Sequence, residues 1–202
     1  RCLAMDGRTH AIVGAATAVA VAQPKDVSGF VFAVSAGVLG GLYCDVDSKL
    51  SKGSKLLNKF LMATVTCITG ALAIRMLAPD TVGRLIVFPM AYAKAFIGFL
   101  GMLVLAVVGS RTAHRRVTHS IEFILLVFVF AFLISPNFGV FVTAGMLSHS
   151  ILDLFNKKPV RISLLLKIDV CFNLCSSASR TSNVIATIAM LALVVYPVTL
   201  FV

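Results

Sequence analysis

The feature that most constrains the fold of this chain is a series of long apolar runs separated by short polar loops. The runs cover residues 11–23, 27–44, 56–78, 85–108, 121–134, 138–155 and 184–202. Several approach the roughly 20 residues that a helix needs to cross a bilayer, and none shows the alternation of a strand. With 59% hydrophobic and 13% charged residues, the chain is too apolar for a soluble domain. We therefore predict an all-α fold, a polytopic helical transmembrane bundle of about six or seven helices.

The length of 202 residues suits one membrane-embedded domain, which we place at 5–202. The chain does not begin with methionine, so we interpret residues 1–4 as a leader or a remnant ahead of a natural start at Met5. The run at 11–23 is rich in small residues, which favours a short helix packed inside the bundle. The mixed segment 162–175 is expected to lie along the membrane interface.

Basic residues are concentrated in alternate loops, namely those after the second, fourth and sixth apolar runs. The positive-inside rule then predicts that these loops and the N-terminus face the cytoplasm, in a multi-pass protein of the inner (plasma) membrane. The net charge of +10 is explained by topology and by contact with anionic lipid. The chain lacks the basic and aromatic interleaving of a nucleic-acid surface, so the lipid bilayer, and not nucleic acid, is the expected partner.

Imidazoles and carboxylates lie at the ends of these apolar runs. By the predicted topology they all fall at the cytoplasmic end of the bundle, which indicates one shared site. His149 and Asp153 are spaced i, i+4 and so share a helix face. Zinc takes three or four such ligands; manganese or iron would accept the same set, and one or two ions would fit. The candidate metal ligands are His10, Asp47, His114, His119, His149 and Asp153.

Each of these elements also has a simpler structural interpretation. His10 alone would be an ordinary interfacial histidine, and Asp45 with Asp47 would neutralise a basic loop. His149 and Asp153 would be a buried hydrogen-bonded pair. Ionisable groups in membrane segments are costly, however, so a group of them at one end favours function.

The ordered motifs of the chain resemble a known family. They are Thr9-His10, the segment Asp45-Val46-Asp47-Ser48, the segment His114-Arg115-Arg116-Val117-Thr118-His119-Ser120, and Gly145-x-x-x-His149-x-x-x-Asp153. Residues 5 to about 185 resemble the YdjM-like family of inner-membrane, LexA-binding, predicted metal-dependent hydrolases. The resemblance implies a polytopic bundle in which these positions, with Ser48, Thr118 and Ser120 among them, form the metal and catalytic site. Ser48 stands where many members have histidine, and Arg116 where many have glycine.

These observations predict a membrane-bound, metal-dependent hydrolase whose site lies at the cytoplasmic interface. Metal-activated water would attack a phosphate-containing lipid or isoprenoid-carrier substrate. Asp45 or Glu122 would take the proton, although a first-turn carboxylate such as Glu122 also simply favours a helix N-terminus. Arg115 and Arg116 would clamp the phosphate, or serve only as topology charges.

Two other functions remain open from sequence. In a metal or cation transporter the same side chains would bind a moving ion, although transporter sites usually lie near the bilayer midplane and within internal repeats. In a membrane-anchored regulatory protein the loops would bind a protein partner, and intact ligands would not be needed.

Overall fold

The computed structural model describes residues 7–48, 59, 63, 92–173 and 180–200. Its elements are α1 (Gly7–Ala22), α2 (Val27–Tyr43), the 3-10 helix η1 (Cys44–Asp47), α5 (Ala93–Ser110), α6 (Ile121–Ile134), α7 (Pro136–Leu154), β1 (Val160–Ser163), β2 (Ile168–Val170) and α8 (Arg180–Leu200). The all-α helical class is therefore confirmed. The run at 56–78, nearly all of its preceding basic loop and residues 1–4 lie outside the described residues, apart from 59 and 63.

Local chemistry sets the ends of the helices. The Asp26 side chain caps α2 by accepting a hydrogen bond from the Gly29 amide at 3.0 Å, and Ser120 caps α6 through the Phe123 amide at 3.3 Å. These are residue types that N-cap positions favour. Pro136 opens α7, where its missing N–H costs nothing. Ser135 alone separates α6 from α7, and the two helices pack against each other.

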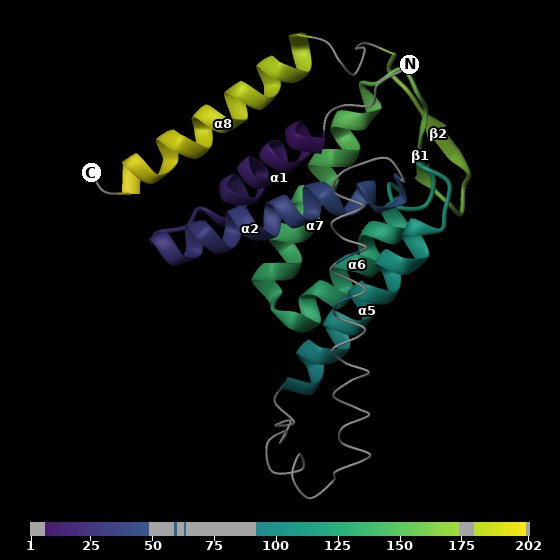
Figure 1. Cartoon of the computed structure of the whole chain (residues 1–202), viewed down its shortest axis with the longest axis horizontal. Coiled ribbons are helices and arrows are strands. Elements are labelled where there is room, and N and C mark those ends of the chain that lie inside the picture. Colours follow the sequence, from purple (N-terminus) through teal and green to yellow (C-terminus); the bar gives the residue numbers. More distant parts are fainter. Residues whose placement is uncertain (1–6, 49–58, 60–62, 64–91, 174–179, 201–202) are drawn as a thin grey trace, which may run out of the picture.

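Three helices, α1, α2 and α7, pack against one another; α6 packs on α7, α5 packs on α6, and α8 lies along α1 (Figure 1). The contact between α1 and α2 is built from small residues. A Cβ added to Gly14 would lie 2.5 Å from the carbonyl oxygen of Gly37 and 3.1 Å from the Cα of Gly41. Such close backbone approach is typical of helices packed inside membranes, and it confirms that the small-residue run 11–23 forms an internal helix.

Three helical segments are long and apolar enough to cross a membrane: Val27–Asp47, Ala93–Ser110 and Thr181–Val198. The apolar helix Ile121–Ile134 is shorter. Large hydrophobic side chains such as Val104 on α5 and Leu191 on α8 are exposed, as expected of helices that face lipid. The membrane prediction is thus supported by both composition and packing.

We expect no strands from the sequence, and this expectation is wrong for the mixed segment 162–175. Part of it forms β2 of a two-stranded antiparallel hairpin, with a bulge between Arg161 and Ser163 on β1. The strands span only four and three residues, too few to produce a readable alternation. A bidentate ion pair joins Arg161 and Asp169 across the two strands at 2.8 and 2.9 Å, and Glu122 of α6 accepts hydrogen bonds from the turn.

Candidate metal centre

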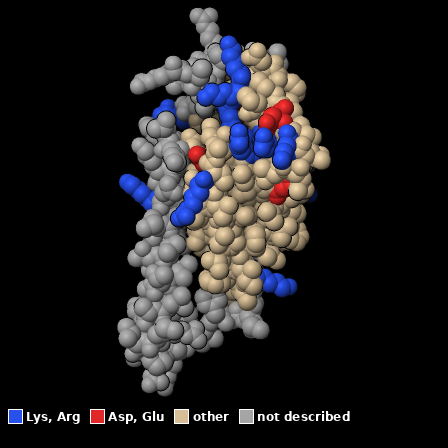
Figure 2. Space-filling view, turned by 90° about the vertical axis from the view of Figure 1, so that its right-hand side faces the viewer, with Lys and Arg blue, Asp and Glu red and all other residues tan. Residues whose placement is uncertain are grey.

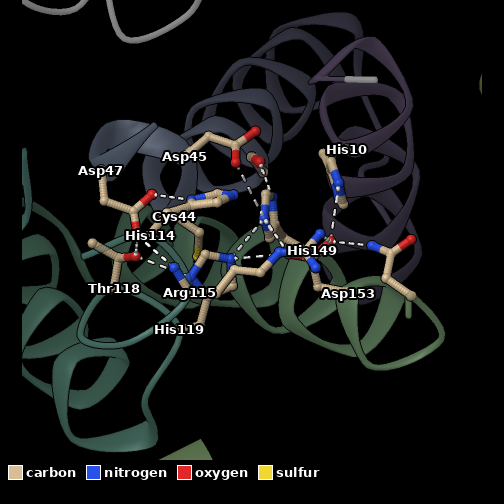
Figure 3. A network of polar contacts seen from close by, with 12 residues as sticks. His10, Cys44, Asp45, Asp47, His114, Arg115, Thr118, His119, His149 and Asp153 are labelled. Atoms are coloured by element: carbon tan, nitrogen blue, oxygen red, sulfur yellow. Dashed lines mark hydrogen bonds and ion pairs between the residues drawn. The ribbon is translucent and has the colours of Figure 1, made fainter. Parts of the chain in front are cut away.

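Residues from four separate segments meet at one end of the bundle (Figure 3). The ring of His119, in the loop before α6, places its Nε2 atom 3.2 Å from Nε2 of His149 on α7. The same His119 atom lies 3.2 Å from Oδ2 of Asp153, one turn beyond His149. Asp45 of η1 places Oδ1 3.8 Å from His149 Nε2. The predicted convergence of these side chains is therefore what the fold produces.

The outer hydrogen bonds fix which nitrogen of each ring carries the proton. His149 Nδ1 lies 2.6 Å from the carbonyl oxygen of Gly41, which only accepts, so Nδ1 carries the hydrogen. The Thr118 hydroxyl donates its one hydrogen to Asp47 Oδ2 at 2.7 Å, so His119 Nδ1, 2.9 Å away, must donate to Thr118. In the neutral rings, both Nε2 atoms are then bare lone pairs that face each other and Asp153.

Asp153 is held from the other side by donors. Its Oδ1 accepts hydrogen bonds from Arg115 Nη2 at 3.1 Å and from Asn156 Nδ2 at 2.7 Å. Its Oδ2 faces the two histidines, at 3.2 Å from His119 and 3.8 Å from His149. The carboxylate is thus oriented by buried donors so that one oxygen is presented to the imidazole lone pairs. This orientation by an outer shell is typical of metal ligands.

His10 closes the cluster from α1. Its ring stacks on that of His149 with centroids 3.8 Å apart, and its Nε2 lies 3.6 Å from Asp153 Oδ1. His10, His149 and Asp153 each offer one ligand atom within a shared distance of 4.8 Å. All three are buried, and a charge buried in this way needs a charge partner or a bound ion.

Asp47 and His114 form a neighbouring pair that organises the loop. Asp47 Oδ1 accepts from His114 Nδ1 at 2.7 Å, and Oδ2 accepts from the Arg115 amide at 2.9 Å and from Thr118. Partial burial opposes a charge on His114, but the hydrogen bond and the negative charge of Asp47 outweigh it and raise the pKa of His114. Although Asp45, Asp47 and His114 also lie close enough to hold an ion, three donors already occupy the oxygens of Asp47.

The arginines and Glu122 lie differently from the expected arrangement. Arg115, held at φ 67°, is buried and paired with Asp153, whereas Arg116 is exposed. The two side chains therefore do not form one open clamp in this structure. The Glu122 carboxylate faces the hairpin, where it accepts from the Ser163 hydroxyl at 2.5 Å and from the Leu164 amide at 3.0 Å. It is not among the residues that contact the histidines.

The remaining predicted positions act on the backbone. Ser120 caps α6 and donates to the Val117 carbonyl oxygen at 2.8 Å. The half-buried Ser48 ends η1, and its backbone N–H donates a hydrogen bond to the Asp45 carbonyl oxygen at 3.0 Å. Sequence reasoning missed two site residues, Gly41 and Asn156. Asn156 follows Asp153 by three residues just past α7, a spacing that could have indicated it. The role of the Gly41 carbonyl oxygen depends on helix packing and had no sequence signal.

The donor set fits a divalent cation. Two neutral imidazole nitrogens and one or two carboxylates are ligands that zinc accepts, and manganese and iron accept them as well. Each imidazole donates its other N–H to an acceptor, as metal-bound histidines do. The most exposed members are His114 and Asp45, whose side chains are 33% and 14% accessible. Solvent or substrate would therefore reach the cluster from the side of η1 and this loop.

Comparisons with known proteins identify the family but not the chemistry. No curated protein and no solved structure matches the chain. The model of one family, described as the YdjM inner membrane protein, matches residues 5–201. That match covers nearly the whole chain, including every residue of the cluster. The chain therefore belongs to the YdjM inner membrane protein family.

Proposed function

We propose that this protein is a membrane-embedded, metal-dependent hydrolase whose His119, His149 and Asp153 hold a divalent cation. The observation that supports this most strongly is the 3.2 Å approach of two imidazole nitrogens whose partners leave both as lone pairs. Two lone pairs and a carboxylate oxygen repel one another unless a metal ion, or a proton on one of the rings, lies between them. A bound metal ion removes this repulsion, and zinc is the ion we favour.

The surrounding residues divide into supporting and reacting groups. When bound, a divalent cation supplies Lewis acidity that lowers the pKa of water toward neutrality. Asp45 is partly exposed and lies beside His149, so it is placed to accept a proton from water or to complete the ligand set. Thr118 and Gly41 hold the two imidazoles in their tautomers, and Asp47 positions Thr118.

A phosphate-containing lipid or isoprenoid carrier is the substrate class that we favour. Asp45 and the loop of His119 lie at the ends of Val27–Asp47 and Ala93–Ser110, two helical segments that are apolar enough for the membrane, where lipid headgroups are found. Arg116 is exposed in the same loop as His119, whereas the buried Arg115 is paired with Asp153, so Arg116 is the one of these two arginines that is open to a substrate. Guanidinium groups recognise phosphate oxygens through paired hydrogen bonds.

The position of the cluster argues for a hydrolase over a transporter. His10 lies in the first turn of α1, while His149 and Asp153 lie in the last turns of α7. Transporter sites usually lie near the midplane, where helices are interrupted. A site at the helix ends instead meets water and headgroups, the two reactants of a lipid hydrolysis.

Metal content tests the first part of the proposal. The detergent-purified protein, loaded with Zn²⁺ or Mn²⁺ and then desalted, should retain metal measured by mass spectrometry, whereas Asp153→Asn and His149→Ala should lose it. Asp169→Asn is the matched control, because this aspartate is exposed and pairs with Arg161 in the hairpin. Absence of retained metal in the wild type, or equal retention in Asp153→Asn, would remove the basis of the proposal.

Turnover tests the second part. Protein in nanodiscs should release phosphate from a long-chain phosphatidic acid or an isoprenyl diphosphate only when metal is present, and Asp45→Asn should lower the rate more than it lowers metal content. Metal binding without release from either substrate would leave a metal site but refute this substrate class. Metal flux into sealed vesicles, with no turnover, would instead establish the transporter.

A further inference from the structure

The tip of the β1–β2 hairpin exposes two leucines to the surroundings. Leu165 and Leu166 are 83% and 72% accessible, the largest values among the exposed large hydrophobic residues of the described chain. Turns at water-facing surfaces are usually polar, and exposed apolar surface commonly marks a site of membrane or protein contact. The tip therefore needs an apolar partner that the described part of the chain does not supply.

The exposure is enforced by hydrogen bonds. The Glu122 carboxylate accepts from the Ser163 hydroxyl at 2.5 Å, the Leu164 amide at 3.0 Å and the Leu165 amide at 3.3 Å. The Leu166 amide donates to Ser163 Oγ at 3.2 Å. Hydrogen bonds to an ionised carboxylate are among the stronger ones. Glu122 thus fixes the turn in place, with both leucine side chains pointing away from the protein.

The tip also lies where the apolar surface of α6 ends. Glu122 is the second residue of α6, and the neighbouring Ile121 and Leu125 are exposed on that helix. With 14 residues, α6 is about 21 Å long, roughly 9 Å less than the hydrocarbon core of a bilayer. The two leucines continue the apolar surface at the end where α6 is too short.

Exposed lysines lie at the tip of the hairpin and just before its first strand. Lys157 and Lys158 precede β1, and Lys167 follows the leucines in the turn; all three are exposed. Figure 2 shows that Lys and Arg side chains gather toward one end of the face that carries the hairpin. Leucines followed by a lysine at the tip, with two further lysines before the hairpin, match the chemistry of an interface in which apolar chains lie beneath anionic headgroups.

We propose that the hairpin tip is an interfacial anchor, in which Leu165 and Leu166 insert into the boundary between headgroups and acyl chains. Anionic lipid is then contacted by Lys157, Lys158 and Lys167. Glu122 acts as the positioning residue, because its hydrogen bonds hold the turn in place. The anchor does not depend on hydrolysis. It bears on the metal centre because the Arg161 amide of β1 donates to the Arg115 carbonyl oxygen at 3.1 Å. The loop that carries His119 is thereby tied to the membrane surface.

The absence of tryptophan from the chain allows a direct test. Leu165→Trp and Leu166→Trp each introduce a single tryptophan at the tip, and Val129→Trp introduces one on the exposed face of α6. In nanodiscs of phosphatidylcholine and phosphatidylglycerol, the emission maximum of the tip tryptophans should lie at a shorter wavelength than that of free tryptophan. Iodide in the buffer should quench their fluorescence only weakly. Lipids brominated near the headgroup should quench them most, whereas Val129→Trp should be quenched most by lipids brominated deeper in the chain.

Two further comparisons test the charges and the positioning residue. Replacing phosphatidylglycerol by phosphatidylcholine should reduce quenching at the tip but not at Val129→Trp. Glu122→Gln, combined with Leu165→Trp, should increase iodide quenching because the turn loses its ionised acceptor. The anchor is refuted if iodide quenches the tip tryptophans as strongly as free tryptophan. Blue emission that neither iodide nor brominated lipid quenches would also refute it, since protein would then cover the tip.

Discussion

Adding one methyl group at Gly14 should separate α1 from α2 and displace His10. The new Cβ would lie 2.5 Å from the Gly37 carbonyl oxygen and 3.1 Å from the Cα of Gly41. A carbon and an oxygen normally stay about 3.3–3.6 Å apart, so the two backbones must part by roughly 1 Å. Because His10 precedes Gly14 by one helical turn, its ring moves with the helix.

The energetic effect follows from the same geometry. Overpacking costs about 1–3 kcal/mol, and here the upper part of the range applies, because the nearest groups are backbone atoms that cannot rotate away. The higher helix propensity of alanine returns up to about 1 kcal/mol. We therefore expect Gly14→Ala to lower the free energy of unfolding by about 2 kcal/mol, which corresponds to a fall of about 4–8 °C in Tm for a chain of this size.

Gly7→Ala is the matched control, because a Cβ there would have no neighbour closer than 3.9 Å. Thermal unfolding in detergent should show Gly7→Ala at or above the wild-type Tm and Gly14→Ala well below it. Zinc retention should also fall in Gly14→Ala, since the variant shifts His10 against His149. If both variants unfold at the same temperature and retain the same zinc, the close packing of α1 on α2 does not position the cluster.

Three further predictions concern the hydrogen bonds around the cluster. Thr118→Val, which leaves His119 Nδ1 without its oxygen partner, should weaken metal affinity by about 10–100-fold, while Thr118→Ser should keep it near wild type. Arg115→Met should lower the free energy of unfolding by about 3–5 kcal/mol, because Asp153 loses a buried charged donor. Denaturant titration of metal-free protein measures this loss, and Arg115→Lys should restore part of the lost stability. The pKa of His114 is raised in the folded protein. The ion pair between His114 and Asp47 therefore contributes fully to the free energy of unfolding below the unfolded-state pKa of about 6.5, and this contribution is lost as the pH rises through the folded-state pKa. The stability difference between wild type and His114→Gln should accordingly shrink from pH 6 to pH 9. A constant difference across that range would show that the Asp47 charge does not act on His114.

Sequence reasoning predicted the membrane class and most of the helices, because both depend on local composition. Apolar runs must become helices inside a bilayer, where every backbone hydrogen bond has to be satisfied within the segment. The run at 121–134 coincides with α6, and the run at 138–155 nearly coincides with α7. The hairpin was not predicted, because its short strands depend on Glu122 and on the Arg161–Asp169 pair. Both contacts join residues that sequence patterns do not connect.

The sequence by itself placed the histidines and aspartates of the cluster at the ends of apolar runs, and the positive-inside rule predicted that these ends lie on one side of the membrane. Only the tertiary structure decided what each residue does there. Asp153 and Asp47 are both aspartates at the end of an apolar run, and both are candidate metal ligands from sequence. In the structure Asp153 presents an oxygen to two imidazoles, whereas the carboxylate oxygens of Asp47 already accept three hydrogen bonds. Arg115 is drawn inside by Asp153 while its neighbour Arg116 stays exposed. The physical reason is that a buried charge must find its partner across elements distant in sequence, and only the packing of α1, α2 and α7 sets which partners come within reach.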